Sequence, residues 1–227
     1  MPLWSRGLAL SLVALLSVPF ANGARLTNAS EQGKTARQVI VASETAMKDV
    51  KSFHVVGMVG GKATASSFSL SLSATGGGGD VSVPGATLKL VVAAGTVYIR
   101  ANEASWLKLT GSQATAQLVA NRWIKAPASN TDFSNFAALT ITTDFVAEFF
   151  PGAATHISEA AGTVTWHREK VILLTDPEGD RLYVAATGAP YMLYVQGKSS
   201  QDSLTFSEFG DAQLPAVPSN AISLPGT

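Results

Sequence analysis

The sequence predicts an α+β domain built around an antiparallel sheet. From Phe53 onward most of the chain alternates apolar and polar residues with period two, in short runs separated by Gly, Pro and Asp. Helical spacing of apolar residues is confined to a few segments. The hydrophobic fraction is 46% and the charged fraction only 14%, whereas typical domains carry about 25% charged residues. A chain of 227 residues with this composition can build a large core, or a core with an apolar cavity.

The N-terminus has the pattern of a secretory signal. Arg6 precedes an apolar run, Gly7 to Phe20, which is shorter than the roughly 20 residues that span a bilayer. Small residues then favour cleavage between Gly23 and Ala24. An uncleaved N-terminal anchor is the alternative. We expect a signal peptide, a disordered leader and one exported domain, over residues 1–23, 24–30 and 31–227.

The first half of that domain reads as a helix followed by a meander. Apolar residues at helical spacing predict a helix from Glu31 to Ser52, with Ser30 as its N-cap. The run Gly76 to Gly79 is expected to break the second of the strands that follow. Extended segments are predicted at Phe53–Val59, Ser66–Ala74, Ala86–Ala93, Thr96–Arg100, Trp106–Leu109 and Arg122–Ala126, with a short helix at Ser112–Asn121.

A phenylalanine-rich segment follows, and we expect two short helices in it. Thr131 or Asp132 is the predicted N-cap of the first helix, and Thr143 or Asp144 that of the second. Phe145 and Phe149 are spaced i, i+4 and therefore share one helix face. These rings either belong to an ordinary helix core or form an apolar lid over a lipid cavity on the sheet.

The C-terminal part returns to strands, ending in a proline-rich tail. Its central feature is the hairpin Arg181 to Val195, where Thr187–Pro190 supplies the turn. Both faces of this hairpin carry large apolar side chains, although an antiparallel sheet usually has one solvated face. Something must cover the second face: a helix, another sheet, a membrane or an apolar ligand. The remaining strands are expected at Thr155–Ile157, Thr163–His167, Lys170–Thr175 and Ser203–Phe209.

Catalytic and cofactor signals are weak throughout the chain. The three histidines, His54, His156 and His167, lack metal-ligand spacing, and no nucleophile elbow or phosphate-loop spacing occurs. The absence of cysteine excludes disulfides and thiolate metal sites. The net charge is zero, so the chain lacks the excess of positive charge that is typical of nucleic-acid-binding proteins. We therefore expect a protein that is not an enzyme and carries no cofactor or metal.

Several segments resemble the LolA-like proteins, and most closely the actinobacterial LprG/LppX lipoproteins. They are the closing hairpins, Leu182–Tyr191 and Leu204–Gly210, and the earlier runs Val97–Arg100, Trp106 and Trp123–Pro127. The resemblance implies a strongly curved antiparallel half-barrel with helices plugging its concave face, and an apolar cavity for acyl chains. It also implies a carrier of lipids, glycolipids or lipoproteins across the cell envelope. The lipobox cysteine of that branch is absent, so we expect a soluble periplasmic, envelope or secreted protein.

The cavity residues follow from this resemblance and from the apolar pattern. On the lid they are Phe133, Phe136, Phe145 and Phe149, and on the sheet Leu90, Val92, Tyr183 and Tyr194. The expected ligand is a lipid or an acylated molecule bound by a monomer, with a membrane or envelope protein as a possible further partner. The main alternative is a structural or protein-interaction domain with a filled core. A secreted hydrolase is the third interpretation.

Overall fold

A computed structural model describes residues 34–60, 64–130, 133–150, 159–177, 179–198 and 201–223, with side chains of the strand that begins at Glu159 described from Gly162. The predicted signal peptide and leader, the strand at Thr155–Ile157, and the capping candidates Thr131 and Asp132 lie outside these residues.

The described residues form one sheet of twelve strands and five helices. The strands are β1 (Ser52–Val59), β2 (Ser66–Ser73), β3 (Gly76–Val83), β4 (Ala86–Ala93), β5 (Thr96–Ala101), β6 (Ile124–Pro127), β7 (Glu159–Trp166), β8 (Glu169–Thr175), β9 (Arg181–Ala185), β10 (Met192–Gln196), β11 (Ser203–Ser207) and β12 (Ile222–Ser223). The helices are α2 (Ala36–Asp49), α3 (Glu103–Thr110), α4 (Gln113–Val119), α5 (Ser134–Ala138) and α6 (Thr142–Phe149).

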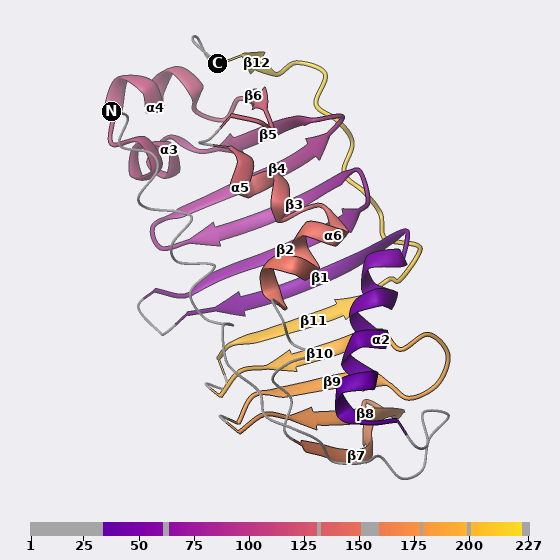
Figure 1. The fold of residues 1–227 in the computed structure, drawn as a ribbon. Helices are drawn as coiled ribbons and strands as arrows, with labels where there is room; N and C mark the ends of the chain where they lie inside the picture. The colour runs from indigo at the N-terminus through magenta and orange to yellow at the C-terminus, as the bar shows by residue number, and fades with distance from the viewer. Residues whose placement is uncertain are drawn as a thin grey trace.

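Two meanders meet at the middle of this sheet. Strands β1 to β6 form the first and β7 to β11 the second, and β1 pairs antiparallel with β11 to join them. The short β12 adds a parallel pair to β6 at the edge, so the proline-rich tail does reach the sheet. The result is a long twisted ladder that is not strongly curled (Figure 1). The α+β class with an antiparallel sheet is confirmed, while the sheet is flatter than the half-barrel that the resemblance implies.

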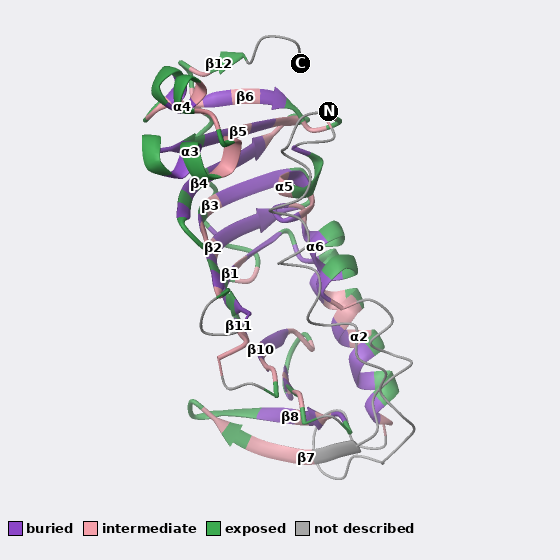
Figure 2. Cartoon of the chain, turned by 90° about the vertical axis from the view of Figure 1, so that its left-hand side faces the viewer, coloured by how far each residue is buried: buried purple, intermediate pink, exposed green. Residues whose placement is uncertain are grey.

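Helices α2, α5 and α6 lie on one face of the sheet, which we call the helix-covered face; the opposite side is the open face. Figure 2 shows α2 and α6 with their buried sides turned to the strands and their exposed sides turned away. Helix α2 lies over the second meander, whereas α5 and α6 lie over the first (Figure 1). Helices α3 and α4 pack together beside β4.

Helix α2 shows how local signals set its start. Thr35 is the N-cap: its Oγ1 accepts from the backbone N–H of Gln38 at 3.2 Å, and the Gln38 side chain accepts from the Thr35 N–H at 2.8 Å. The predicted N-cap, Ser30, was therefore wrong. One stripe of the helix is buried against the sheet, including Val39, Ile40 and Met47.

The glycine run that was expected to break a strand is itself strand β3. A Cβ on Gly77 would lie 2.0 Å from the carbonyl oxygen of Ser71, and one on Gly79 would lie 2.0 Å from that of Ser69. Only glycine permits this close approach of β3 to β2. Four glycines show no period-two pattern, so alternation could not reveal this strand.

Two further local predictions need correction. The segment Trp106–Leu109 is helical, within α3, because Asn102 caps the helix by accepting from the Ser105 N–H at 2.8 Å and Gly111 ends it in a left-handed conformation. Ser112 caps α4 as predicted. The N-cap position of α6 is Ile141, so neither Thr143 nor Asp144 caps that helix.

Candidate functional site

A layer of phenylalanine rings fills the space between α6 and the centre of the sheet. Phe145 and Phe149 stack on each other with their ring centroids 4.3 Å apart. Phe145 also meets sheet rings edge-on, at 6.1 Å from Phe53 and 6.3 Å from Phe206. Phe149 lies 5.9 Å from Phe68. Phe145 is 0% exposed and Phe149 only 4%, so this layer excludes water from the middle of the helix-covered face.

The other predicted lid and sheet residues join the same apolar cluster, with two exceptions. Phe133 is buried, Phe136 is half-buried against the cluster, and Leu90 and Val92 of β4 are buried beneath them on the helix-covered face. Six of the eight predicted residues therefore share one apolar layer. Sequence reasoning missed the sheet rings of this layer, although their period-two pattern on the strands was available as a signal. These missed rings are Phe53, Phe68 and Phe206.

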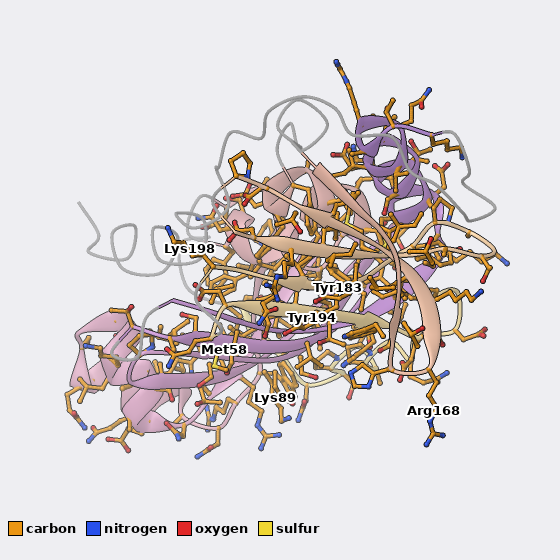
Figure 3. The ribbon with its side chains drawn as sticks, turned by 90° about the horizontal axis from the view of Figure 1, so that it is seen from below. Met58, Lys89, Arg168, Tyr183, Tyr194 and Lys198 are labelled. Atoms are coloured by element: carbon orange, nitrogen blue, oxygen red, sulfur yellow. The ribbon has the colours of Figure 1, made fainter. Side chains whose placement is uncertain are left out.

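Tyr183 and Tyr194 are the two exceptions, because they lie on the open face. Their strand neighbours Leu182, Val184 and Val195 belong to the cluster under the helices, so alternation turns the tyrosines outward. Tyr194 stacks on Trp166 at 5.4 Å with an interplanar angle of 18°, and Tyr183 lies 5.5 Å from Tyr194. Figure 3 shows the two tyrosines side by side. The structure thus separates them from the phenylalanine layer by the thickness of the sheet.

The lid helices are held on the sheet chiefly by apolar contacts. Helix α5 has five residues and α6 has eight, and among the described residues neither has an N-cap side chain that bonds its first turn. Helices this short are marginal on their own in water. The buried hydroxyls of Thr142 on α6 and Ser43 on α2 have no hydrogen-bond partner in the described part of the chain. Helices α5 and α6 therefore depend on their apolar contacts with the sheet and not on helix caps.

Helix α2 carries a titratable group whose pKa is shifted. Burial raises the pKa of the Glu44 carboxyl above 4.5, and the nearby Lys48 partly opposes that rise. Beneath this helix a small cavity of about 30 Å³ lies between Ile40 and strands β8 to β10.

The described histidines have ordinary structural roles. His54 lies on the open face, and its two ring nitrogens are 3.1 Å from the hydroxyls of Ser71 and Ser69. His167 sits in the turn between β7 and β8 with a φ of 46°. Within the described ranges, no three side chains of the metal-ligating types gather in a possible metal site. No helix of those ranges has the length and apolar character to span a membrane.

A scan against protein-family models and a search of curated proteins find no match for this chain. Solved structures do match. LprF from Mycobacterium bovis superposes with a TM-score of 0.53 at 14% identity, covering 80% of this chain and 96% of LprF. The Mycobacterium tuberculosis lipoprotein LppX gives 0.47 at 13% identity, covering 78% of this chain and 96% of LppX. An uncharacterized conserved protein from Thermus thermophilus gives 0.38 at 12% identity, over 83% of this chain and 98% of its own. The chain therefore shares the fold of LprF over most of its length, and the predicted resemblance to the LprG/LppX-type lipoproteins is confirmed at the level of the fold.

Proposed function

We propose that this protein is an exported, noncatalytic carrier that binds acyl chains between the lid helices and the sheet. The observation that carries the proposal is the phenylalanine layer: short, uncapped helices held over the sheet by aromatic contacts. An acyl chain offers the same kind of contact as these rings. It can therefore replace them on the sheet when α6 moves, and the ligand-binding residues are Phe133, Phe136, Phe145, Phe149, Leu90 and Val92.

The energetics suit such an exchange. Each buried CH₂ contributes about 0.8 kcal/mol, so a chain of some sixteen carbons offers roughly 12 kcal/mol in gross terms. Displacing Phe145 and Phe149 from the sheet costs about 2–3 kcal/mol for each ring. The surplus leaves enough free energy to move a short helix without any polar contact to the ligand. Such a site needs no catalytic or charged residue, which agrees with the chemistry of the helix-covered face.

The similarity of fold to LprF supports this proposal, as do the apolar signal at the N-terminus and the missing lipobox cysteine. Together they favour a carrier that works free in the cell envelope or outside the cell. One observation favours the alternative, a protein-interaction domain with a filled core: Phe145 and Phe149 stack on each other beneath α6 and are 0% and 4% exposed. The two functions differ in whether α6 opens to admit a ligand.

Native mass spectrometry of the protein purified from its own host tests the proposal. We expect a copurifying lipid mass that organic solvent releases. A clean apo mass, together with no uptake of fluorescent fatty acid or phospholipid, would mean that the helix-covered face is filled by protein alone.

A reversible clamp tests where the acyl chain enters. Ser73 at the end of β2 and Ile141 at the start of α6 form an isolated parallel bridge, which places their backbones at a spacing that a disulfide can span. The chain has no native cysteine to interfere. We expect the double variant Ser73→Cys, Ile141→Cys to take up fatty acid when reduced and to resist uptake when oxidised. Each single-cysteine variant is the matched control, and equal uptake in both redox states would refute entry beneath α6.

A further inference from the structure

The open face holds a second apolar feature that acyl-chain binding does not use. A hollow of about 690 Å³ lies over β7, β10 and β11, within the range of about 300–1,000 Å³ that is common for small-molecule sites. Trp166, Leu193 and Tyr194 give it an aromatic and aliphatic floor. We call this hollow the aromatic pocket.

Polar side chains surround that floor. Glu169 follows the β7–β8 turn, Glu208 follows β11, and the hydroxyls of Thr205 and Ser207 stand on β11. His167 completes the rim. The rim thus offers two carboxylates that accept hydrogen bonds, two hydroxyls that donate and accept, and one imidazole. A flat apolar floor inside such a rim suits a ligand that has an apolar face and an edge of hydroxyl groups.

The backbone around the rim is strained. His167 and Arg168 both have positive φ, at 46° and 72°, in a two-residue hairpin turn where Asn-Gly is the favoured pair. Glu208 also has a positive φ, at 55°. Each such residue costs about 1–2 kcal/mol, and such strain concentrates at binding sites. The turn sets Trp166 on Tyr194, while Arg168 points away from the protein in Figure 3.

The geometry argues against two other ligand classes. The rings of Trp166, Tyr183 and Tyr194 have centroids 5.4–5.7 Å apart, so they touch one another and leave no space between them for a quaternary ammonium group. The two carboxylates of the rim repel phosphate and other anions. A neutral polyol avoids both conflicts.

We propose that the aromatic pocket binds a neutral saccharide. The C–H face of a sugar ring packs on Trp166 and Tyr194, and its hydroxyls donate to Glu169 and Glu208. This pocket opens on the other face of the sheet from the proposed acyl-chain site, and Phe206 of β11 borders both. The saccharide test measures binding that does not require an acyl chain, so each proposal can fail its own test.

Titration calorimetry of the purified protein with maltotriose, cellotriose and mannotriose tests the proposal. We expect at least one to bind, and Trp166→Ala to weaken that binding by about tenfold. Trp123→Ala is the matched control, since Trp123 is a half-buried tryptophan outside the pocket, and it should leave binding unchanged. Fatty-acid uptake should be the same in both variants.

A second variant covers the case in which Trp166→Ala does not fold. The double change Glu169→Gln, Glu208→Gln keeps the shape of two exposed side chains and removes their charge, so we expect folded protein with weaker saccharide binding. The proposal is overturned if none of the three sugars binds, or if binding survives both changes. It is also overturned if tetramethylammonium or phosphatidylglycerol vesicles bind in a Trp166-dependent way and the sugars do not.

Discussion

The two halves of the open face differ more than any other two regions of this sheet. The first meander presents serines there, and Ser69 and Ser71 both contact His54. The second meander presents the rings of Trp166, Tyr183 and Tyr194, which contact one another. One half is therefore a polar strand surface joined by side-chain hydrogen bonds, and the other is a small cluster of aromatic rings.

Two neighbouring cross-strand rows make the contrast plain. On the helix-covered face, one row is apolar at every strand from β9 across the sheet to β5: Leu182, Val195, Leu204, Gly57, Phe68, Val81, Leu88 and Ala101. On the open face, the adjacent row changes from aromatic to charged: Tyr183, Tyr194, Thr205, Val56, Ser69, Asp80, Lys89 and Arg100. Burial under the helices requires an apolar residue at each position of the first row. The second row has no such requirement, so its change from aromatic to charged residues is the better guide to function.

The largest effect is expected where the first meander depends on backbone contact. Gly77→Ala places a Cβ 2.0 Å from the Ser71 carbonyl oxygen, so β2 and β3 must separate, and we expect a loss of about 3 kcal/mol or more in unfolding free energy. Gly95→Ala is the control: it meets no atom within 4 Å and pays only for its positive φ, about 1 kcal/mol. Urea unfolding measures both, and equal losses would contradict the close-approach account.

The next comparison sets the two faces against each other. Phe145→Ala removes a fully buried ring that meets four others, so we expect a loss of about 3–5 kcal/mol. Tyr194→Ala removes a half-buried ring from the open face, and we expect about 1–2 kcal/mol. Thermal and urea unfolding of the two variants measure this difference. A greater loss for Tyr194→Ala would make the aromatic cluster the true core of the second meander.

A smaller effect is expected in the polar half of the open face. His54→Ala removes two part-buried side-chain hydrogen bonds, to Ser71 and Ser69, so we expect a loss of about 0.5–1.5 kcal/mol. The same unfolding measurement checks it. A loss as large as that of Phe145→Ala would show that the serine surface is not simply solvated.

The smallest effect concerns charge on the helix-covered side. Because burial raises the folded pKa of Glu44, the folded state holds its proton more tightly than the unfolded state does, and stability falls as pH rises from 4.5 through the raised folded value. Glu44→Gln removes this loss. We expect the variant to be slightly more stable than the wild type at pH 7 and the gain to vanish at about pH 3–4. A pH-independent difference would point to packing instead of ionisation.

The sequence predicted secondary structure correctly where the apolar and polar side chains form a regular pattern along the chain. Strands β1, β2, β4 and β5 and the second meander were predicted because apolar residues alternate along them, and α4 because Ser112 marks its start. Strand β3 was missed because its glycines have no side chains to alternate. Helix α3 was missed because Trp106–Leu109 resembles a strand, and its caps at Asn102 and Gly111 were not weighed.

The sequence also placed only some of the candidate site residues on the correct face of the sheet. Helical spacing located Phe145 and Phe149 on one face, and the sheet later supplied their partners. Period two places Tyr183 and Tyr194 on one side of their strands, yet it cannot say which side the helices cover. The pairing of strands that are far apart in the sequence decides which face the helices cover. The alternation of residues within one strand does not show that pairing.

That distant pairing has a consequence for how the chain folds. Strand β1 finds its partner β11 only after most of the sequence has intervened, and contacts of Ser52 and Gly60 with Ala212 and Asp202 close the same seam. Each meander can form from its own hairpins, but joining them must close a loop of well over a hundred residues, which is entropically costly and slow. A chain that emerges from its N-terminus therefore carries β1 paired with β2 on one edge only, and its other edge stays open until β11 is available.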